Sequence, residues 1–108
     1  MFIARQVSLD VIRALRAIVE SLERVDKSLA DQVRRAASSA ALNVCEGAKR
    51  AGKDRAHFYR VAAGSCAEVR AAIAVSTAWG YLGGIDTVPI DSLLDRQAAL
   101  LHRLAHKR

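Results

Sequence analysis

The run from Gln32 to Gly47, QVRRAASSAALNVCEG, constrains the fold more than any other part of the chain. Its composition is that of a helix, but it contains almost no bulky side chains. Ala36, Ala40 and Val44 recur every four residues, so one face of the helix forms a smooth ridge. A ridge of small residues allows a second helix to pack at a short interaxial distance. The run therefore predicts one member of a closely packed helix pair.

A second stretch of small residues, Ala62 to Glu68, follows about twenty positions later and provides a partner for the first. It contains Gly64, and a glycine inside a helix costs roughly 1 kcal/mol relative to alanine, which favours a role for Gly64 in close packing. Pairing the two helices about the loop between them places Arg34 or Arg35 near Glu68. The same pairing puts Ala36 opposite Ser65 and Asn43 opposite Phe58. We expect an Arg–Glu ion pair that fixes the register, with the alternative that the second arginine faces a neighbouring subunit.

Apolar spacing predicts four helices in a single domain over residues 1–108. The first shows alternating steps of four and three residues at Val11, Leu15, Ile18 and Leu22, which is typical of a bundle seam. Ser8 and Ser28 are the expected N-caps of the first two helices. The expected helices span about 8–25, 28–47, 53–79 and 88–106. Short connections make consecutive helices antiparallel, so the predicted fold is an all-α, up-down-up-down four-helix bundle.

Three motifs resemble a known bacterial family. They are QVRRAASSAALNVCEG, the segment FYRVAAGSCAE at 58–68, and Gly80-Tyr81-Leu82. Together they resemble the four-helix-bundle proteins that include those encoded in intervening sequences of 23S rRNA genes and Avd, the accessory protein of diversity-generating retroelements. The resemblance covers residues 9–104, and only the loop Lys49–Ala56 departs from the pattern. The motif positions taken as structural are Arg34, Arg35, Asn43, Glu46, Gly47, Gly64, Ser65 and Glu68.

The resemblance implies a four-helix bundle that often assembles into a ring-shaped pentamer and has no known active site. For some members it also implies binding to nucleic acid or to a reverse transcriptase. From the residues themselves, Asn43 is interpreted as a buried amide that ties helices together. Glu46 is interpreted as a carboxylate that binds either Arg55 or backbone N–H donors near the turn.

Charge gives an independent indication of function, because the chain carries a net charge of +6 and a pI near 10.0. In an up-down bundle the N-terminus, the second loop and the C-terminus lie at the same end. That end is expected to carry most of the unopposed cations. The other end is expected to carry the acidic residues Glu20, Glu23, Asp26 and Asp31. Such a basic end favours a polyanionic partner through counterion release. The predicted nucleic-acid-binding residues are Arg5, Lys49, Arg50, Lys53, Arg55, His57, Tyr59, Arg60, Arg103, Lys107 and Arg108. Phe58 is assigned to the core, and His57 and Tyr59 to a stacking surface for unpaired bases.

Catalytic and metal-binding patterns are weak. His102 and His106 have the spacing of metal ligands on a helix, but no third ligand is predicted beside them. Neither Cys45 nor Cys66 is expected to lie next to a histidine that could act as a general base. Two isolated cysteines and the absence of any apolar run of about 20 residues favour a cytoplasmic protein without a membrane span. We expect no enzyme activity, no cofactor and no metal.

These observations leave two interpretations. The first is a non-catalytic, oligomeric module that binds RNA or DNA through the basic end as a ribonucleoprotein accessory, for example in reverse transcription. The second is a protein-interaction scaffold, whose oligomeric surface docks a protein such as a reverse transcriptase and whose charge only aids solubility.

Overall fold

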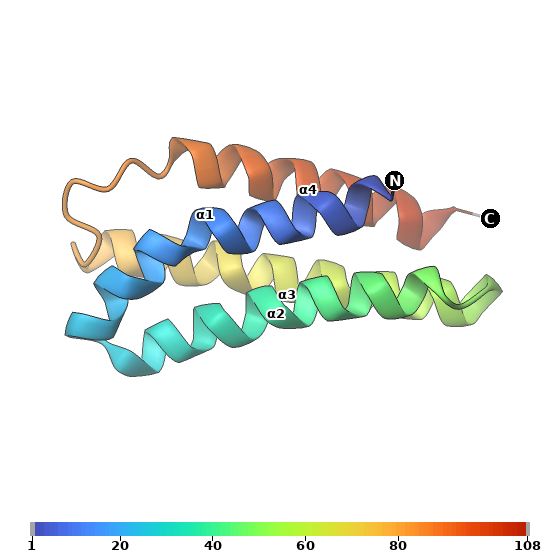
Figure 1. Ribbon diagram of the computed structural model, residues 1–108, viewed down its shortest axis with the longest axis horizontal. Helices are drawn as coiled ribbons and strands as arrows, with labels where there is room; N and C mark the ends of the chain where they lie inside the picture. The colour runs from blue at the N-terminus through green and yellow to red at the C-terminus, as the bar shows by residue number, and fades with distance from the viewer. Residues whose placement is uncertain (1, 108) are drawn as a thin grey trace.

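The computed structural model describes residues 2–107, which form four α-helices and no strand. The helices are α1 (Ile3–Val25), α2 (Lys27–Ala48), α3 (Gly52–Ala78) and α4 (Val88–His106). Consecutive helices run in opposite directions and lie alongside one another in a bundle 43 × 23 × 21 Å in extent (Figure 1). The predicted four-helix bundle is confirmed. The bounds of α2, α3 and α4 differ from the predicted ones by at most one residue at each end.

The seam predicted for α1 forms the centre of the core. Val11, Leu15, Ile18 and Leu22 are each almost fully buried, and Leu94 and Leu101 of α4 are completely buried against this side of the bundle. Burying one such aliphatic side chain stabilises the folded state by about 1.5–3 kcal/mol. The two aliphatic stripes therefore supply the bulk that α2 and α3 lack.

The start of α1 lies at Ile3, so the prediction that Ser8 caps this helix is wrong. Ser8 is buried inside α1, where its hydroxyl donates to the Ala4 carbonyl at 2.8 Å and accepts a hydrogen bond from Gln97 Nε2 of α4 at 3.0 Å. A serine hydroxyl inside a helix can donate to the carbonyl four residues earlier, so a serine need not stand at the start of a helix. Ser8 therefore joins α1 to α4 instead of starting α1.

Asp26, and not Ser28, caps α2. It is the single residue between α1 and α2: its backbone N–H donates to Leu22 O at 2.7 Å, and its carboxylate accepts from the Leu29 N–H at 3.0 Å. One residue thus completes the last turn of one helix and caps the next.

The closely packed helix pair is α2 and α3, as the small residues predict. Ala36, Ala40 and Val44 of α2 are buried, as are Ala62 and Ser65 of α3. The register differs from the prediction by about one helical turn. Ser65 Oγ donates to Ser39 Oγ at 2.9 Å, so Ser39 is the residue paired with Ser65, where Ala36 was expected.

Asn43 is half-buried and makes no direct bond to α3. Its amide donates to the carbonyl and to the hydroxyl of Ser39, at 2.8 and 3.2 Å. Because the Ser39 hydroxyl also accepts the bond from Ser65, Asn43 supports the link between the helices through Ser39.

The predicted ion pair with Glu68 does not form. Arg34 instead binds Glu23 of α1 and Asp31 of its own helix, the latter at 2.9 Å, and these carboxylates raise the pKa of its guanidinium. Arg35 and Glu68 are both exposed and make no ion pair within residues 2–107. The reason is position around the helix: Arg34 lies on the edge of α2 that borders α1, away from α3.

Gly47 marks a tight contact between α2 and α3. A Cβ built there would come within 2.8 Å of Tyr59 Cε1, because the buried tyrosine ring packs directly against the glycine. Gly64, by contrast, is exposed, and a Cβ there would meet nothing within 4 Å. The prediction that Gly64 serves close packing is therefore wrong, and Gly47 has that role.

The two glycines give a matched pair of variants with opposite expected effects. Gly64→Ala should stabilise the protein by up to about 1 kcal/mol, since alanine is the better helix former and has room. Gly47→Ala should destabilise it, because overpacking costs about 1–3 kcal/mol and exceeds the gain in helix propensity. Thermal unfolding followed by circular dichroism measures both, and a shift of 1 kcal/mol corresponds to about 4–8 °C in a domain of this size. Equal melting temperatures for the two variants would contradict the assignment.

Candidate nucleic-acid interface

The topology brings three separate segments to one end of the molecule. The start of α1, the α2–α3 connection and the end of α4 meet at the end where both chain termini lie (Figure 1). Phe2, Arg55 and Lys107, one from each segment, line a single pocket there. We call this end the basic pole. Its described cations are Arg5, Lys49, Arg50, Lys53, Arg55, Arg103 and Lys107, all of them exposed. Arg108, also predicted here, lies outside the described residues, and Arg60 is exposed about one turn further into α3.

Arg50 is the cation of the basic pole that is neutralised. Its guanidinium binds Glu46 at 3.0 Å and Asp54 at 3.3 Å, which raises its pKa, and it lies 5.2 Å from the centre of the Phe58 ring. The prediction that Glu46 binds Arg55 or backbone donors near the turn is therefore wrong, because Glu46 binds Arg50. Arg55 Nε instead donates to the Arg50 carbonyl at 2.8 Å, which fixes the arginine against the end of the loop.

The remaining cations of the basic pole make no ion pair with any of residues 2–107. These are Arg5, Lys49, Lys53, Arg55, Arg103 and Lys107. The opposite end differs, because Lys27 and Arg34 there bind Asp31, and Arg34 also binds Glu23. Asp86 at that end caps α4 by accepting from the Val88 N–H at 3.0 Å. Six cations without an acidic partner in residues 2–107 therefore gather at the basic pole, while other unpaired arginines, such as Arg24, Arg35 and Arg96, are spread over the rest of the bundle.

Phe58 and Tyr59 have the reverse of the burial that was predicted for them. Tyr59 is only 2% exposed, whereas Phe58 is half-buried under Arg50 and beside the exposed His57. The outward placement of Tyr59 is therefore wrong. Counting back along the buried stripe of α3, from Val69 through Cys66 and Ala62, leads to position 59. Helical periodicity could thus have identified the buried aromatic correctly.

A pocket of about 510 Å³ lies between the segments of the basic pole. Phe2, Tyr59 and Leu104 contribute its apolar and aromatic wall, and Arg55 and Lys107 contribute its charge. Burial raises the pKa of Tyr59, and the nearby positive charge of Arg55 lowers it by less. No sequence pattern indicated Phe2 as a wall residue, since it precedes the predicted start of the first helix.

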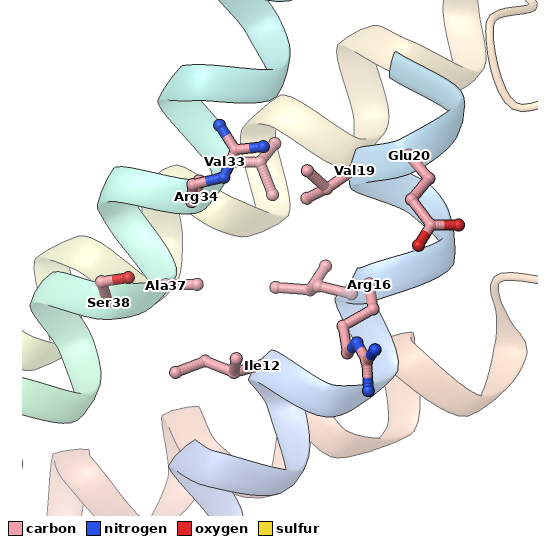
Figure 2. A pocket seen from close by; sticks show the side chains of 9 residues that line it. Ile12, Arg16, Val19, Glu20, Val33, Arg34, Ala37 and Ser38 are labelled. Carbon is pink, nitrogen blue, oxygen red and sulfur yellow. The ribbon is translucent and has the colours of Figure 1, made fainter. Parts of the chain in front are cut away.

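A second hollow lies on the side of the bundle, between α1 and α2. Ile12 and Val19 of α1 face Val33 and Ala37 of α2 across an apolar groove of about 270 Å³ (Figure 2). Its remaining lining residues are Leu15, Arg16, Glu20, Arg34 and Ser38. Leu42, one turn beyond Ser38 on α2, is 68% exposed and extends the apolar surface toward the basic pole. The seam pattern did not indicate this groove, because Ile12 and Val19 flank the buried stripe.

Cys66 and His106 each contact a backbone carbonyl. The Cys66 thiol is buried near the Leu94 carbonyl, and burial raises its pKa, which disfavours the reactive thiolate. His102 and His106 are neighbours on α4, but one nitrogen of His106 already contacts the His102 carbonyl at 2.7 Å. No cluster of three or more potential metal ligands occurs within residues 2–107. None of the four helices is both long and apolar enough to cross a bilayer over the part of the chain that the structure describes.

Comparison with known proteins places this geometry in a family. Neither a curated protein nor a solved structure matches the chain. The model of one protein family, described as 23S rRNA-intervening sequence protein, does match, over residues 3–103. That match covers all of α1, α2 and α3 and most of α4. The chain therefore belongs to the 23S rRNA-intervening sequence protein family.

Proposed function

We propose that this protein is a non-catalytic nucleic-acid-binding module that acts as an accessory to a ribonucleoprotein. The observation that carries the proposal is the group of unpaired cations that three chain segments bring to one pole. RNA is the preferred ligand, since the family is named for its association with 23S rRNA genes. The module acts in the cytoplasm, where the free thiols of Cys45 and Cys66 stay reduced.

The mechanism is phosphate binding without sequence readout. Each phosphate neutralised by a lysine or arginine releases condensed counterions, and this entropy gain drives the association. The start of α3 also points backbone N–H groups into the same region, where a helix N-terminus favours an anion. Contacts of this kind position a nucleic acid but do not distinguish its bases.

Self-association multiplies this effect in the proposed function. A ring needs two different complementary faces, and the α1–α2 groove supplies an apolar one whose rim carries both Arg16 and Glu20. A second copy of the chain, which is basic overall but carries both signs of charge along its helices, is the occupant that we propose for this groove. In the pentamer that the family resemblance implies, five basic poles would act together on one ligand.

The α1–α2 groove also favours a second candidate function. In this alternative the protein is a scaffold that docks another protein, such as a reverse transcriptase, and does not bind nucleic acid. The half-buried apolar side chains of Ile12 and Val19 are the observation in its favour.

The first test removes charge from the basic pole without touching an ion pair. The variant Lys49→Ala/Lys53→Ala/Arg55→Ala should bind single-stranded RNA more weakly. The slope of log affinity against log salt should fall by about 2, because each lost phosphate contact removes about 0.7. Fluorescence anisotropy over a salt series measures both quantities. Circular dichroism should show unchanged helicity.

The matched control removes three exposed cations elsewhere, Arg24, Arg35 and Arg96, each changed to alanine. None of them makes an ion pair within residues 2–107, so net charge falls equally in both variants. We expect the control to keep most of the salt slope. An equal loss in both variants would mean that only net charge matters. Absence of RNA binding by the unmodified protein at low salt would favour the scaffold alternative.

The second test addresses the groove. Val19→Asp places a carboxylate among apolar side chains and should reduce the mass measured by light scattering to that of a monomer, since an unpaired buried charge is costly at an interface. Val88→Asp, at an exposed valine outside the groove, is the control and should leave the mass unchanged. A monomeric unmodified protein, or equal masses for the two variants, would contradict self-association through this groove.

A further inference from the structure

The pocket at the basic pole combines an aromatic wall with a cationic rim. The Phe2 and Tyr59 rings lie 6.4 Å apart at an angle of 45°, and Leu104 lines the same cavity from α4. Tyr59 is only 2% exposed and its ring packs against Gly47, so little of the ring is accessible from the pocket. The half-buried Phe2 and Leu104 provide the accessible apolar surface on which a flat ring can pack.

The rim offers hydrogen-bond donors that the protein itself leaves unused. Arg55 Nε is held by the Arg50 carbonyl, while the two terminal nitrogens of its guanidinium make no ion pair with residues 2–107. Lys107 enters from the end of α4 and likewise has no acidic partner within that range. An arginine that is fixed at Nε presents its other two nitrogens as a fork, which suits a phosphate.

The volume fits a small ligand. At about 510 Å³ the pocket falls within the range of about 300–1,000 Å³ that is typical of small-molecule sites. Ala48, Gly52 and Ala56 complete the lining and leave this space open. A ligand that combines a flat apolar ring with an anionic group would satisfy both halves of the site.

We infer that this pocket holds one unpaired nucleotide of a bound strand, with its base on Phe2 and Leu104, next to the buried Tyr59, and its phosphate on Arg55 and Lys107. The inference rests on the proposed function and deepens it, because it specifies single-stranded nucleic acid over a duplex. A base inside a duplex is stacked and paired and cannot enter such a pocket unless it is flipped out at a cost. Stacking of a base on aromatic side chains tolerates any base, so the site selects unpaired nucleotides without reading sequence.

The experiment compares a single-stranded RNA that carries one 2-aminopurine with a blunt-ended RNA duplex of the same length in nucleotides per strand. The single strand should bind more tightly, and the fluorescence of 2-aminopurine should change on binding as the base enters the pocket. Phe2→Ala should weaken binding of the single strand by about five- to tenfold. Its salt slope and its affinity for the duplex should not change, because no charge is altered.

A second pair of variants tests whether the weaker binding of Phe2→Ala could result from misfolding. Ala48→Leu adds bulk to the lining of the pocket and should weaken single-strand binding in the same way. Ala51→Leu, three residues further along in the α2–α3 connection and outside the lining, is the matched control and should bind as the unmodified protein does. All four proteins should give the same helical circular dichroism spectrum.

The outcomes separate this inference from the proposed function. Equal affinity for single strand and duplex, or normal single-strand binding by both Phe2→Ala and Ala48→Leu, would overturn the pocket while phosphate binding by the pole stands. Absence of any RNA binding at low salt would overturn both. A single-strand preference that is lost in Phe2→Ala and Ala48→Leu but kept in Ala51→Leu would support the inference.

Discussion

The contact between α2 and α3 through small residues is the constraint on which the rest of the molecule depends. Two helices with little bulk must lie close together to exclude water, and this closeness requires Gly47 where the Tyr59 ring crosses. The same contact sets the positions at which the two helices end, and therefore the place of the loop that carries Lys49, Lys53 and Arg55. The basic pole is thus a consequence of core packing, although its own side chains lie in solvent.

Much of the architecture could be predicted from the sequence, because it follows from periodicity alone. The seam of α1, the small ridges of α2 and α3, and the grouping of charge at one end all follow from helical spacing and antiparallel order. What failed was detail at the level of single residues. The register of α2 on α3 was inferred by symmetry about the loop, whereas the structure sets it through Ser39 with Ser65 and Gly47 with Tyr59.

The candidate site was predictable in its charges but not in its shape. The cationic residues can be read directly from the sequence. Whether a given cation is neutralised depends on acidic neighbours one helical turn away. Arg50 reaches both Glu46 and Asp54, so it contributes less free charge than its position suggests. The pocket could not be foreseen, since it needs Phe2, Tyr59 and Leu104 from three helical segments whose contact depends on tertiary packing. A long side chain can reach several partners, and the sequence pattern alone does not predict which partner it binds.

The connection between α3 and α4 has a practical consequence. Residues 79–87 lie at the end of the bundle opposite the basic pole, and the left-handed backbone of Gly80 and Gly83 lets the chain reverse there. Leu82 is buried in the core and the Tyr81 carbonyl accepts from Ser21 Oγ of α1, so only the exposed Gly83-Gly84 pair can change in length without loss of packing. A tether, label or appended domain attached at Gly83-Gly84 would leave the basic pole unobstructed. The bundle can therefore be immobilised or fused at one end while its other end remains available to a ligand.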